Sequence, residues 1–361
     1  MKKILHCVNS MNMGGIETLL MNIFRNIDRK EYQFDFACVE REKAVYDDEI
    51  FSLGGKIKYM PPFRYKNPFK IFADLSARKK FFKNNNEYDV CHIHSSNAFN
   101  AYYRAKYAIQ AGIKTVIVHS HNSSGINRKL NSFYQKRLSK LNIVRLACSQ
   151  QAGEWMFGAK EFQIINNAID LDKFYYNPSV REKIRAEHNW QNMFIVGHIG
   201  RFNIQKNHKF LIEVFAKVAH DCDDAILVLI GKGELEAEIK EQVSNYGMQD
   251  KVFFLGIKQN ANEYLQAMDV FAFPSLYEGL GIAYIEAQAS GAKTLISNTI
   301  PFVPITDNLN SLSIQNVDQW VDEIKSEHGK ERKEALFCDL KNEYDIHKTI
   351  EKLCKIYNQS V

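Results

Sequence analysis

Two glutamates lie on either side of a Gly-x-Gly turn in the segment SLYEGLGIAYIEAQASG, residues 275–291. Apolar residues recur at helical spacing after the turn, so we expect a helix that begins near Gly281, with Glu286 inside it and Glu278 in the loop before it. The dipole at such a helix start favours an anion, which carboxylates would repel unless they bound neutral donors such as sugar hydroxyls. Taken alone, Glu286 is better explained as an exposed helical glutamate.

A pair of cations lies in the segment GRFNIQKNH, residues 200–208. Arg201 directly follows a predicted strand, and Lys206 comes five residues later, at the expected start of a helix. The planar fork of an arginine and the point charge of a lysine can converge on one anionic group and suit a diphosphate. In isolation, two unrelated surface cations are the simpler explanation.

Glycines mark two further loops after predicted strands. Gly14 and Gly15 stand where the first strand passes to a helix, a place where the backbone can approach a phosphate. The dinucleotide fingerprint G-x-G-x-x-G is missing, so a tight turn explains this pair better on its own. The segment GKGE, with Gly231 and Gly233, is a weaker signal still.

Metal and disulfide signals are weak. The acidic segment DCDD, residues 221–224, imitates a D-x-D metal motif but falls between a helix and a strand, at the end remote from the ligand loops. We therefore expect an acidic turn and no metal site, because no other cluster has metal-ligand spacing. The chain has 7 cysteines, far apart and without a C-x-x-C pair, which predicts free and mostly buried thiols.

The elements that must position these residues alternate between strand and helix along the whole chain. This βα pattern predicts α/β architecture with two doubly wound parallel sheets of the Rossmann-like type, which would face each other across a cleft. The periodicity pauses at residues 164–184, where we place the linker. We assign residues 1–168 to an N-terminal domain and 169–344 to a C-terminal domain. A final helix at about 345–361 can pack back on the first.

Composition describes an ordinary globular protein, with 361 residues, 45 % hydrophobic and 25 % charged. No apolar run reaches the roughly 18 to 20 residues that a membrane span needs, and polar residues interrupt the N-terminus too early for a signal peptide. We therefore expect a cytoplasmic protein.

The charge is uneven. Residues 1–176 hold 27 Lys and Arg against 16 Asp and Glu, or +11, whereas the remainder holds 20 against 26, or −6. Basic residues mix with Phe and Tyr at 56–83 and 127–140, which fits an anionic membrane surface and a solvated face over core aromatics equally well. Nucleic acid is not an expected partner, because the pI is moderate and no nucleic-acid module appears.

Together these motifs resemble one family. The segments GGIE, INNAID, GRFNIQKN, GKGE, VFFLG and FPSLYEGLGIAYIEAQASG follow the order and spacing of the retaining glycosyltransferases of family 4, which have the GT-B fold. The block E-G-x-G-x-x-x-x-E together with G-R-x-x-x-x-K is specific, and the resemblance covers nearly the whole chain.

The resemblance implies a nucleotide-sugar site. Arg201 and Lys206 would hold the donor diphosphate, with the loop at Gly15 closing from the other domain. Glu286 would bind the ribose hydroxyls, and Glu278 the transferred sugar.

Other positions are carried over in the same way. The backbone N–H groups of Gly279, Leu280 and Gly281 would lie near the donor, and Ile257 would meet the base. His121 would touch the sugar near the reacting carbon, with His119 as the less favoured alternative.

The implied activity is retaining, metal-independent transfer of a hexose from a nucleotide diphosphate, with UDP as the expected nucleotide and without a cofactor. The acceptor would be a saccharide, often lipid-linked, in capsule or exopolysaccharide assembly at the inner membrane face, where the enzyme would bind peripherally. A nucleotide-sugar epimerase and a binding protein without turnover remain as alternatives. The sequence departs from the family at Ala168, where glycine is usual, and in FVPITDN, which lacks a common glutamate.

Overall fold

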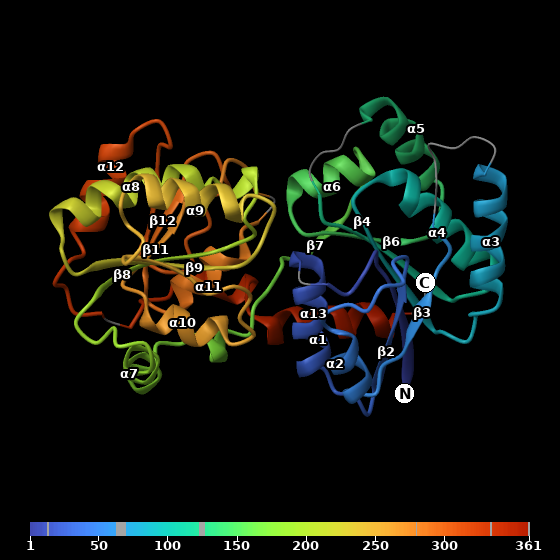
Figure 1. Cartoon of the computed structure of the whole chain (residues 1–361). Coiled ribbons are helices and arrows are strands. Elements are labelled where there is room, and N and C mark those ends of the chain that lie inside the picture. Colours follow the sequence, from blue (N-terminus) through green and yellow to red (C-terminus); the bar gives the residue numbers. More distant parts are fainter. Residues whose placement is uncertain (13, 63–69, 123–126, 279, 333, 360–361) are drawn as a thin grey trace. The chain divides into compact units, whose positions relative to one another are not determined.

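The computed structural model describes residues 1–12, 14–62, 70–122, 127–278, 280–332 and 334–359. The chain forms two compact units. Unit 1 contains residues 1–168 and 343–361, and unit 2 contains residues 169–342. Each unit is a parallel sheet covered by helices on both faces (Figure 1).

Unit 1 has a sheet of seven strands in the order β3-β2-β1-β4-β5-β6-β7. Its strands are β1 (Lys2–Cys7), β2 (Tyr32–Cys38), β3 (Ile57–Tyr59), β4 (Val90–Ser95), β5 (Thr115–Ser120), β6 (Val144–Ala147) and β7 (Gln163–Ile164). Its helices are α1 (Gly15–Asn26), α2 (Asp47–Ser52), α3 (Ile71–Lys83), α4 (Ala98–Gln110), α5 (Arg128–Leu138), α6 (Gln150–Phe157) and α13 (Ile346–Asn358).

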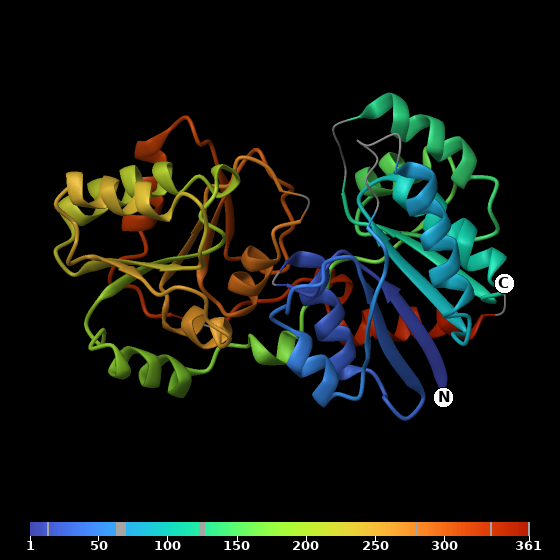
Figure 2. The same ribbon diagram turned by 45° about the vertical axis from the view of Figure 1, so that its right-hand side comes forward.

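The C-terminal helix α13 completes the core of unit 1. Its buried residues Ile346, Leu353 and Tyr357 belong to the same apolar cluster as Leu20 and Phe24 of α1. Two views show α13 beside α1 on one face of the sheet, with α3, α4 and α5 over the other (Figures 1 and 2). The last helix of the chain therefore packs over strands that the first residues of the chain form.

Unit 2 has a sheet of six strands in the order β10-β9-β8-β11-β12-β13. Its strands are β8 (Phe194–Ile199), β9 (Ala225–Ile230), β10 (Val252–Phe254), β11 (Val270–Phe273), β12 (Lys293–Ser297) and β13 (Leu309–Leu312). Its helices are α7 (Pro178–Glu187), α8 (His208–Asp221), α9 (Glu236–Asn245), α10 (Ala261–Ala267), α11 (Ile282–Ala289) and α12 (Val317–Lys325). Short 3₁₀ turns are η1 (Leu171–Lys173), η2 (Ile204–Lys206) and η3 (Asp339–Glu343), whose last residue belongs to unit 1.

Both sheets confirm the predicted doubly wound topology. The chain starts near the middle of each sheet and winds outward in both directions, with switch points between β1 and β4 and between β8 and β11. All paired strands within the two sheets are parallel and mostly buried, which explains their continuous apolar runs, such as AILVLI in β9.

One part of the linker prediction is wrong. Residues 164–184 include the first two turns of α7, which starts with Asn177 as N-cap and Pro178 in the first turn. Only Ile184 and Arg185 of this helix are buried, so its apolar period is too weak to detect. The expected free thiols are confirmed, because all seven cysteines are unpaired and four are buried. Among the described residues, no helix is long and apolar enough to cross a bilayer.

Candidate active site

The predicted diphosphate and sugar residues lie in two loops at the switch point of unit 2. One loop follows β8 and the other follows β11, and ligands of doubly wound sheets bind where such loops diverge. Two hydrogen bonds join the loops: the backbone N–H of Leu276 donates to the carbonyl of Gln205 at 2.8 Å, and Nε2 of Gln205 donates to the carbonyl of Tyr277 at 2.9 Å. The fold thus brings together segments that are far apart in the sequence.

Lys206 and Glu278 form an ion pair across these loops. Lys206 Nζ donates to Glu278 Oε1 at 2.6 Å, and the side chains are only 16 % and 8 % exposed. The ammonium also lies 4.3 Å from the centre of the Phe273 ring, where the π electrons attract a cation. Two of the predicted donor-binding residues are therefore in contact and neutralise each other.

Arg201 has a different carboxylate partner. Its Nη2 lies 3.1 Å from Glu234 Oε2, and both side chains are largely exposed, at 69 % and 56 %. The pKa of Glu234 is lowered, first by a backbone hydrogen bond and then by Arg201. The two cations follow the same strand, as predicted, but each is paired with its own carboxylate.

The glycines of GKGE explain why Glu234 can reach Arg201. Gly231 has φ of +141°, and a Cβ atom there would lie 2.0 Å from the carbonyl oxygen of Gly200. A Cβ at Gly233 would lie 2.3 Å from the carbonyl oxygen of Phe202. Both positions require glycine because the loop after β9 packs backbone against backbone on the loop after β8. The sequence pattern signals this close packing.

Glu286 lies in the second turn of α11 and is half-buried. Its carboxylate makes no hydrogen bond to the described part of the chain, and desolvation raises its pKa to about 8. The prediction of an exposed helical glutamate, which suited Glu286 in isolation, is therefore wrong. A half-buried carboxyl group without a partner is suited to accept hydrogen bonds from a ligand.

The turn before α11 is tightly packed. Gly281 is the N-cap, and a Cβ there would lie 2.7 Å from ring atoms of Phe273 and Tyr284. Leu280 is half-buried, and Gly279 lies outside the described residues. Ile257 lies in the loop after β10 and is 50 % exposed, so its side chain is accessible to a ligand.

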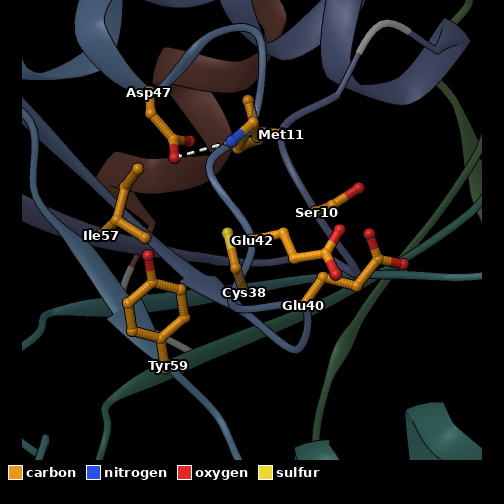
Figure 3. Close-up of a pocket in the computed structure, with 9 residues that line it drawn as sticks. Ser10, Met11, Cys38, Glu40, Glu42, Asp47, Ile57 and Tyr59 are labelled. Atoms are coloured by element: carbon orange, nitrogen blue, oxygen red, sulfur yellow. Dashed lines mark hydrogen bonds between the residues drawn. The ribbon is translucent and has the colours of Figure 1, made fainter.

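In unit 1, Gly15 is the exposed first residue of α1, with Gly14 as N-cap. A narrow hollow nearby is lined by acidic side chains. Figure 3 shows the Glu40 and Glu42 carboxylates beside Ser10. The hollow offers about 180 Å³ of space, open solvent included, but has no room for a water molecule in this conformation.

His121 follows β5 and is buried, with 9 % of its surface exposed. Its Nε2 lies 2.9 Å from Nδ1 of His94, and its Nδ1 is buried without a normal hydrogen bond to any described residue. Burial lowers the pKa of His121 to about 3, although the side chain of Asn167 acts in the opposite direction. His119 is also buried, and its pKa is well below the usual value because of desolvation.

The tertiary structure adds three histidines that the sequence analysis did not single out. His6 of β1 and His92 and His94 of β4 join His119 and His121, and all five are buried. Ring nitrogens of two triads lie within 4.8 Å of one another, namely His6, His92, His94 and His94, His119, His121. The segments HIH and HSH indicate such a cluster, because histidines two apart on a strand share one face of the sheet.

The acidic segment DCDD lies at the end of α8 and in the turn that follows. Asp221 pairs with Lys325, and Asp224 lies 2.8 Å from His328 Nε2. Both carboxylates thus have structural partners on or next to α12.

Comparisons with known proteins assign this architecture to a family. The family model described as Glycosyl transferases group 1 matches residues 180–355, and that described as Glycosyltransferase Family 4 matches residues 13–173. The putative glycosyltransferase EpsF of Bacillus subtilis is 32 % identical, over 99 % of this chain and 97 % of that protein.

Two more distant relatives are each 24 % identical. The capsular polysaccharide biosynthesis glycosyltransferase CapH of Staphylococcus aureus matches over 99 % of both chains. The Escherichia coli UDP-Gal:α-D-GlcNAc-diphosphoundecaprenol α-1,3-galactosyltransferase matches over 82 % of this chain and 79 % of its own.

A solved structure confirms the fold. The crystal structure of Anabaena HepE in complex with UDP and glucose aligns with a TM-score of 0.78, at 16 % identity, over 98 % of this chain and 99 % of that one. The expectation of two Rossmann-like domains in the GT-B arrangement of secondary structure is therefore correct. The chain belongs to glycosyltransferase family 4, and it is an enzyme of the glycosyltransferase class.

Proposed function

We propose that the protein transfers a hexose from a UDP-sugar to a saccharide acceptor, with retention of configuration and without a metal ion. The observation that carries this proposal is the contact of Lys206 with Glu278 at the switch point of unit 2. A cation suited to a diphosphate and a carboxylate suited to sugar hydroxyls lie within hydrogen-bond distance, as a nucleotide-sugar site requires.

The donor would be held by charge and by hydrogen bonds. Lys206 and Arg201 bind the diphosphate, and the N–H groups from Gly279 to Gly281 and the start of α11 add positive potential. Glu286 accepts hydrogen bonds from the ribose hydroxyls, and Ile257 packs on the base. Gly15 provides a close backbone approach to the phosphates. Uridine as the base is supported by the UDP bound in the HepE crystal and by the UDP-Gal in the name of the E. coli relative.

The reaction proposed is a substitution at the anomeric carbon on the face of the leaving group. The acceptor oxygen forms the new bond to that carbon while the bond to the diphosphate oxygen breaks, and a phosphate oxygen takes the acceptor proton. Lys206 and Arg201 stabilise the negative charge that develops on the leaving diphosphate. Glu278 and His121 orient the sugar, and Glu278 stabilises its developing positive charge.

The acceptor we propose is a lipid-linked saccharide in capsular or exopolysaccharide biosynthesis, as the names of CapH and the E. coli relative support. The positive charge of unit 1 fits an acceptor that is anchored in an anionic membrane. On α5, Leu130 and Phe133 are exposed beside Lys136 and Arg137, and Phe72 on α3 is exposed as well. Both helices lie on the same face of the sheet, next to α4 (Figure 1). Such a mixture of aromatic and basic side chains suits an anionic bilayer.

A panel of UDP, GDP, ADP and their sugar conjugates tests the donor, with thermal stability and transfer as the readouts. A ligand at about 100 times its Kd stabilises the protein by about 2.7 kcal/mol, which is readily seen. We expect UDP-sugars to stabilise the parent with or without EDTA, and Arg201→Ala to weaken the effect. Stabilisation that EDTA abolishes would contradict metal independence, and donor conversion without acceptor would indicate an epimerase.

Liposome flotation tests membrane binding. Removing one basic residue near an anionic surface costs about 1 kcal/mol, so the variant Lys136→Gln/Arg137→Gln should lose well over tenfold in binding to anionic vesicles. The matched control is Lys348→Gln/Lys352→Gln, which removes the same charge from two exposed positions on α13 of unit 1. Equal binding of the parent to anionic and zwitterionic vesicles would refute peripheral association.

A further inference from the structure

Five buried histidines form a layer across the centre of the unit 1 sheet. His6 pairs in register with His92 on neighbouring strands, and His94 pairs with His119. All five face the side covered by α1 and α13, where the hydroxyl of Tyr357 lies 3.0 Å from Nδ1 of His92.

Three of these rings form a continuous hydrogen-bonded chain. Nδ1 of His6 lies 3.1 Å from Nε2 of His94, and Nδ1 of His94 lies 2.9 Å from Nε2 of His121. Burial lowers the pKa of each ring far enough that all three are neutral at pH 7. A neutral imidazole has one N–H and one lone pair, so every bond in the chain must run in the same direction.

The two ends of the chain determine that direction. If the protons point toward His121, its Nδ1–H faces the buried, unpartnered Oδ1 of Asn167, which is an acceptor, and only a lone pair of His6 Nε2 remains unpaired. In the opposite direction, a buried N–H of His6 would have no acceptor among the described residues. Since a buried donor without an acceptor is rare in proteins, the first direction is favoured.

We propose that His6 and His94 are positioning residues that hold His121 as its Nδ1–H tautomer. The role of this tautomer in transfer rests on the proposed function, in which His121 contacts the sugar. With Nε2 occupied by the N–H of His94, His121 donates a hydrogen bond through Nδ1 and is not the base that removes the acceptor proton. The Oδ1 atom of Asn167, which has no hydrogen-bond partner among the described residues, is an acceptor near this N–H.

A metal ion explains the same cluster less well. The pKa values of the five rings are shifted by burial, by the other histidines, by the Asn167 side chain and by a backbone group. No carboxylate is among the groups that shift them. A divalent ion here would carry its full charge into a buried site of neutral ligands, which is costly without an acidic partner. It would also compete with two hydrogen bonds of normal length.

Nitrogen NMR of the parent protein, labelled with ¹⁵N-histidine, tests the proposal. Long-range couplings between ring nitrogens and carbon-bound protons distinguish the two neutral tautomers, and single variants assign the signals. We expect His6, His94 and His121 to be neutral Nδ1–H tautomers at pH 7. An Nε2–H tautomer or a charged ring at His121 would overturn the proposal.

A matched pair of variants tests the chain itself. His94→Phe keeps a ring of similar size but removes both hydrogen bonds, whereas His119→Phe alters an equally buried neighbour that bonds to no other ring. We expect His94→Phe to shift His121 toward Nε2–H and to slow sugar transfer about five- to tenfold, the effect of one net hydrogen bond. His119→Phe should leave the His121 tautomer unchanged. Identical His121 tautomers in parent and His94→Phe would contradict the inference.

Two controls distinguish a hydrogen bond donated by His121 Nδ1 from a metal site. His121→Asn keeps an amide N–H near the position of Nδ1 and should retain more transfer than His121→Gln, whose amide lies near Nε2. Stabilisation of the parent by Zn²⁺ that His94→Phe abolishes would refute the hydrogen-bonded chain in favour of a metal site. Absence of transfer by the parent refutes the proposed function only, because the tautomer is measured independently of activity.

Discussion

Replacement of Glu278 with glutamine should make UDP bind more tightly while it abolishes transfer. In the present structure, the Glu278 carboxylate holds Lys206 Nζ at 2.6 Å, in a pair that is largely shielded from water. A diphosphate that binds Lys206 must replace this carboxylate. Glutamine has nearly the same shape but no charge, so it competes less strongly for the ammonium group.

The size of the effect follows from the contact. A hydrogen bond between charged groups contributes about 1.5 to 3 kcal/mol, and one to a neutral amide about 1 kcal/mol. The substitution therefore weakens the competition for Lys206 by about 0.5 to 2 kcal/mol, since the glutamine oxygen still accepts from Lys206. A tenfold change in affinity corresponds to about 1.4 kcal/mol, so the Kd for UDP should fall about two- to thirtyfold.

Isothermal titration calorimetry with UDP on the parent, Glu278→Gln, Lys206→Met and their double variant tests this reasoning. Lys206→Met should weaken UDP binding at least tenfold, and adding Glu278→Gln to it should restore none of the loss, because no ammonium remains to be released. Glu234→Gln is the matched control. Its partner Arg201 is exposed, so we expect a change in Kd of less than twofold.

Two results would refute this account. If Glu278→Gln leaves the Kd for UDP unchanged or raises it, Glu278 does not compete with the diphosphate for Lys206. If Glu278→Gln binds UDP but retains the transfer rate of the parent, Glu278 does not act on the sugar.

The remaining predictions concern unit 2. Because the folded pKa of Glu286, about 8, lies above its usual 4.5, this group favours folding at low pH, and that contribution is lost as the pH rises from about 4.5 to 8. Glu286→Gln should flatten this decline, by up to about 5 kcal/mol, in urea unfolding at several pH values, and an unchanged pH profile would refute the raised pKa. Gly231→Ala should destabilise the unit by about 3 kcal/mol or more, because its Cβ would lie 2.0 Å from a carbonyl oxygen. Gly247→Ala, with φ of +67° and no atom within 4 Å, should cost about 1 kcal/mol when both variants are compared by urea unfolding, and equal losses would contradict the packing argument.

The fold was accessible from the sequence because its signals are local. Apolar runs such as AILVLI mark buried parallel strands, and their alternation with helical periods leaves few topologies other than doubly wound sheets. Elements with a weak apolar pattern were not detected in this way, and α7 is the clearest example. Its start is set by Asn177 and Pro178, and its stability depends on packing against α10, including bonds from Arg181 to the carbonyls of Gln266 and Ala267.

The sequence also determined which residues gather at the switch point, since each follows a strand and the carboxyl ends of parallel strands share one edge. Spacing along the chain does not reveal partners, because these depend on which strands are neighbours in the sheet. The contacts of Lys206 with Glu278 and of Arg201 with Glu234 therefore emerged only from the tertiary structure. The same holds for the histidine chain, which joins β1, β4 and the residue after β5, and for the burial that raises the pKa of Glu286. The sequence supplied the chemical groups, and packing decided their charge, their direction and their partners.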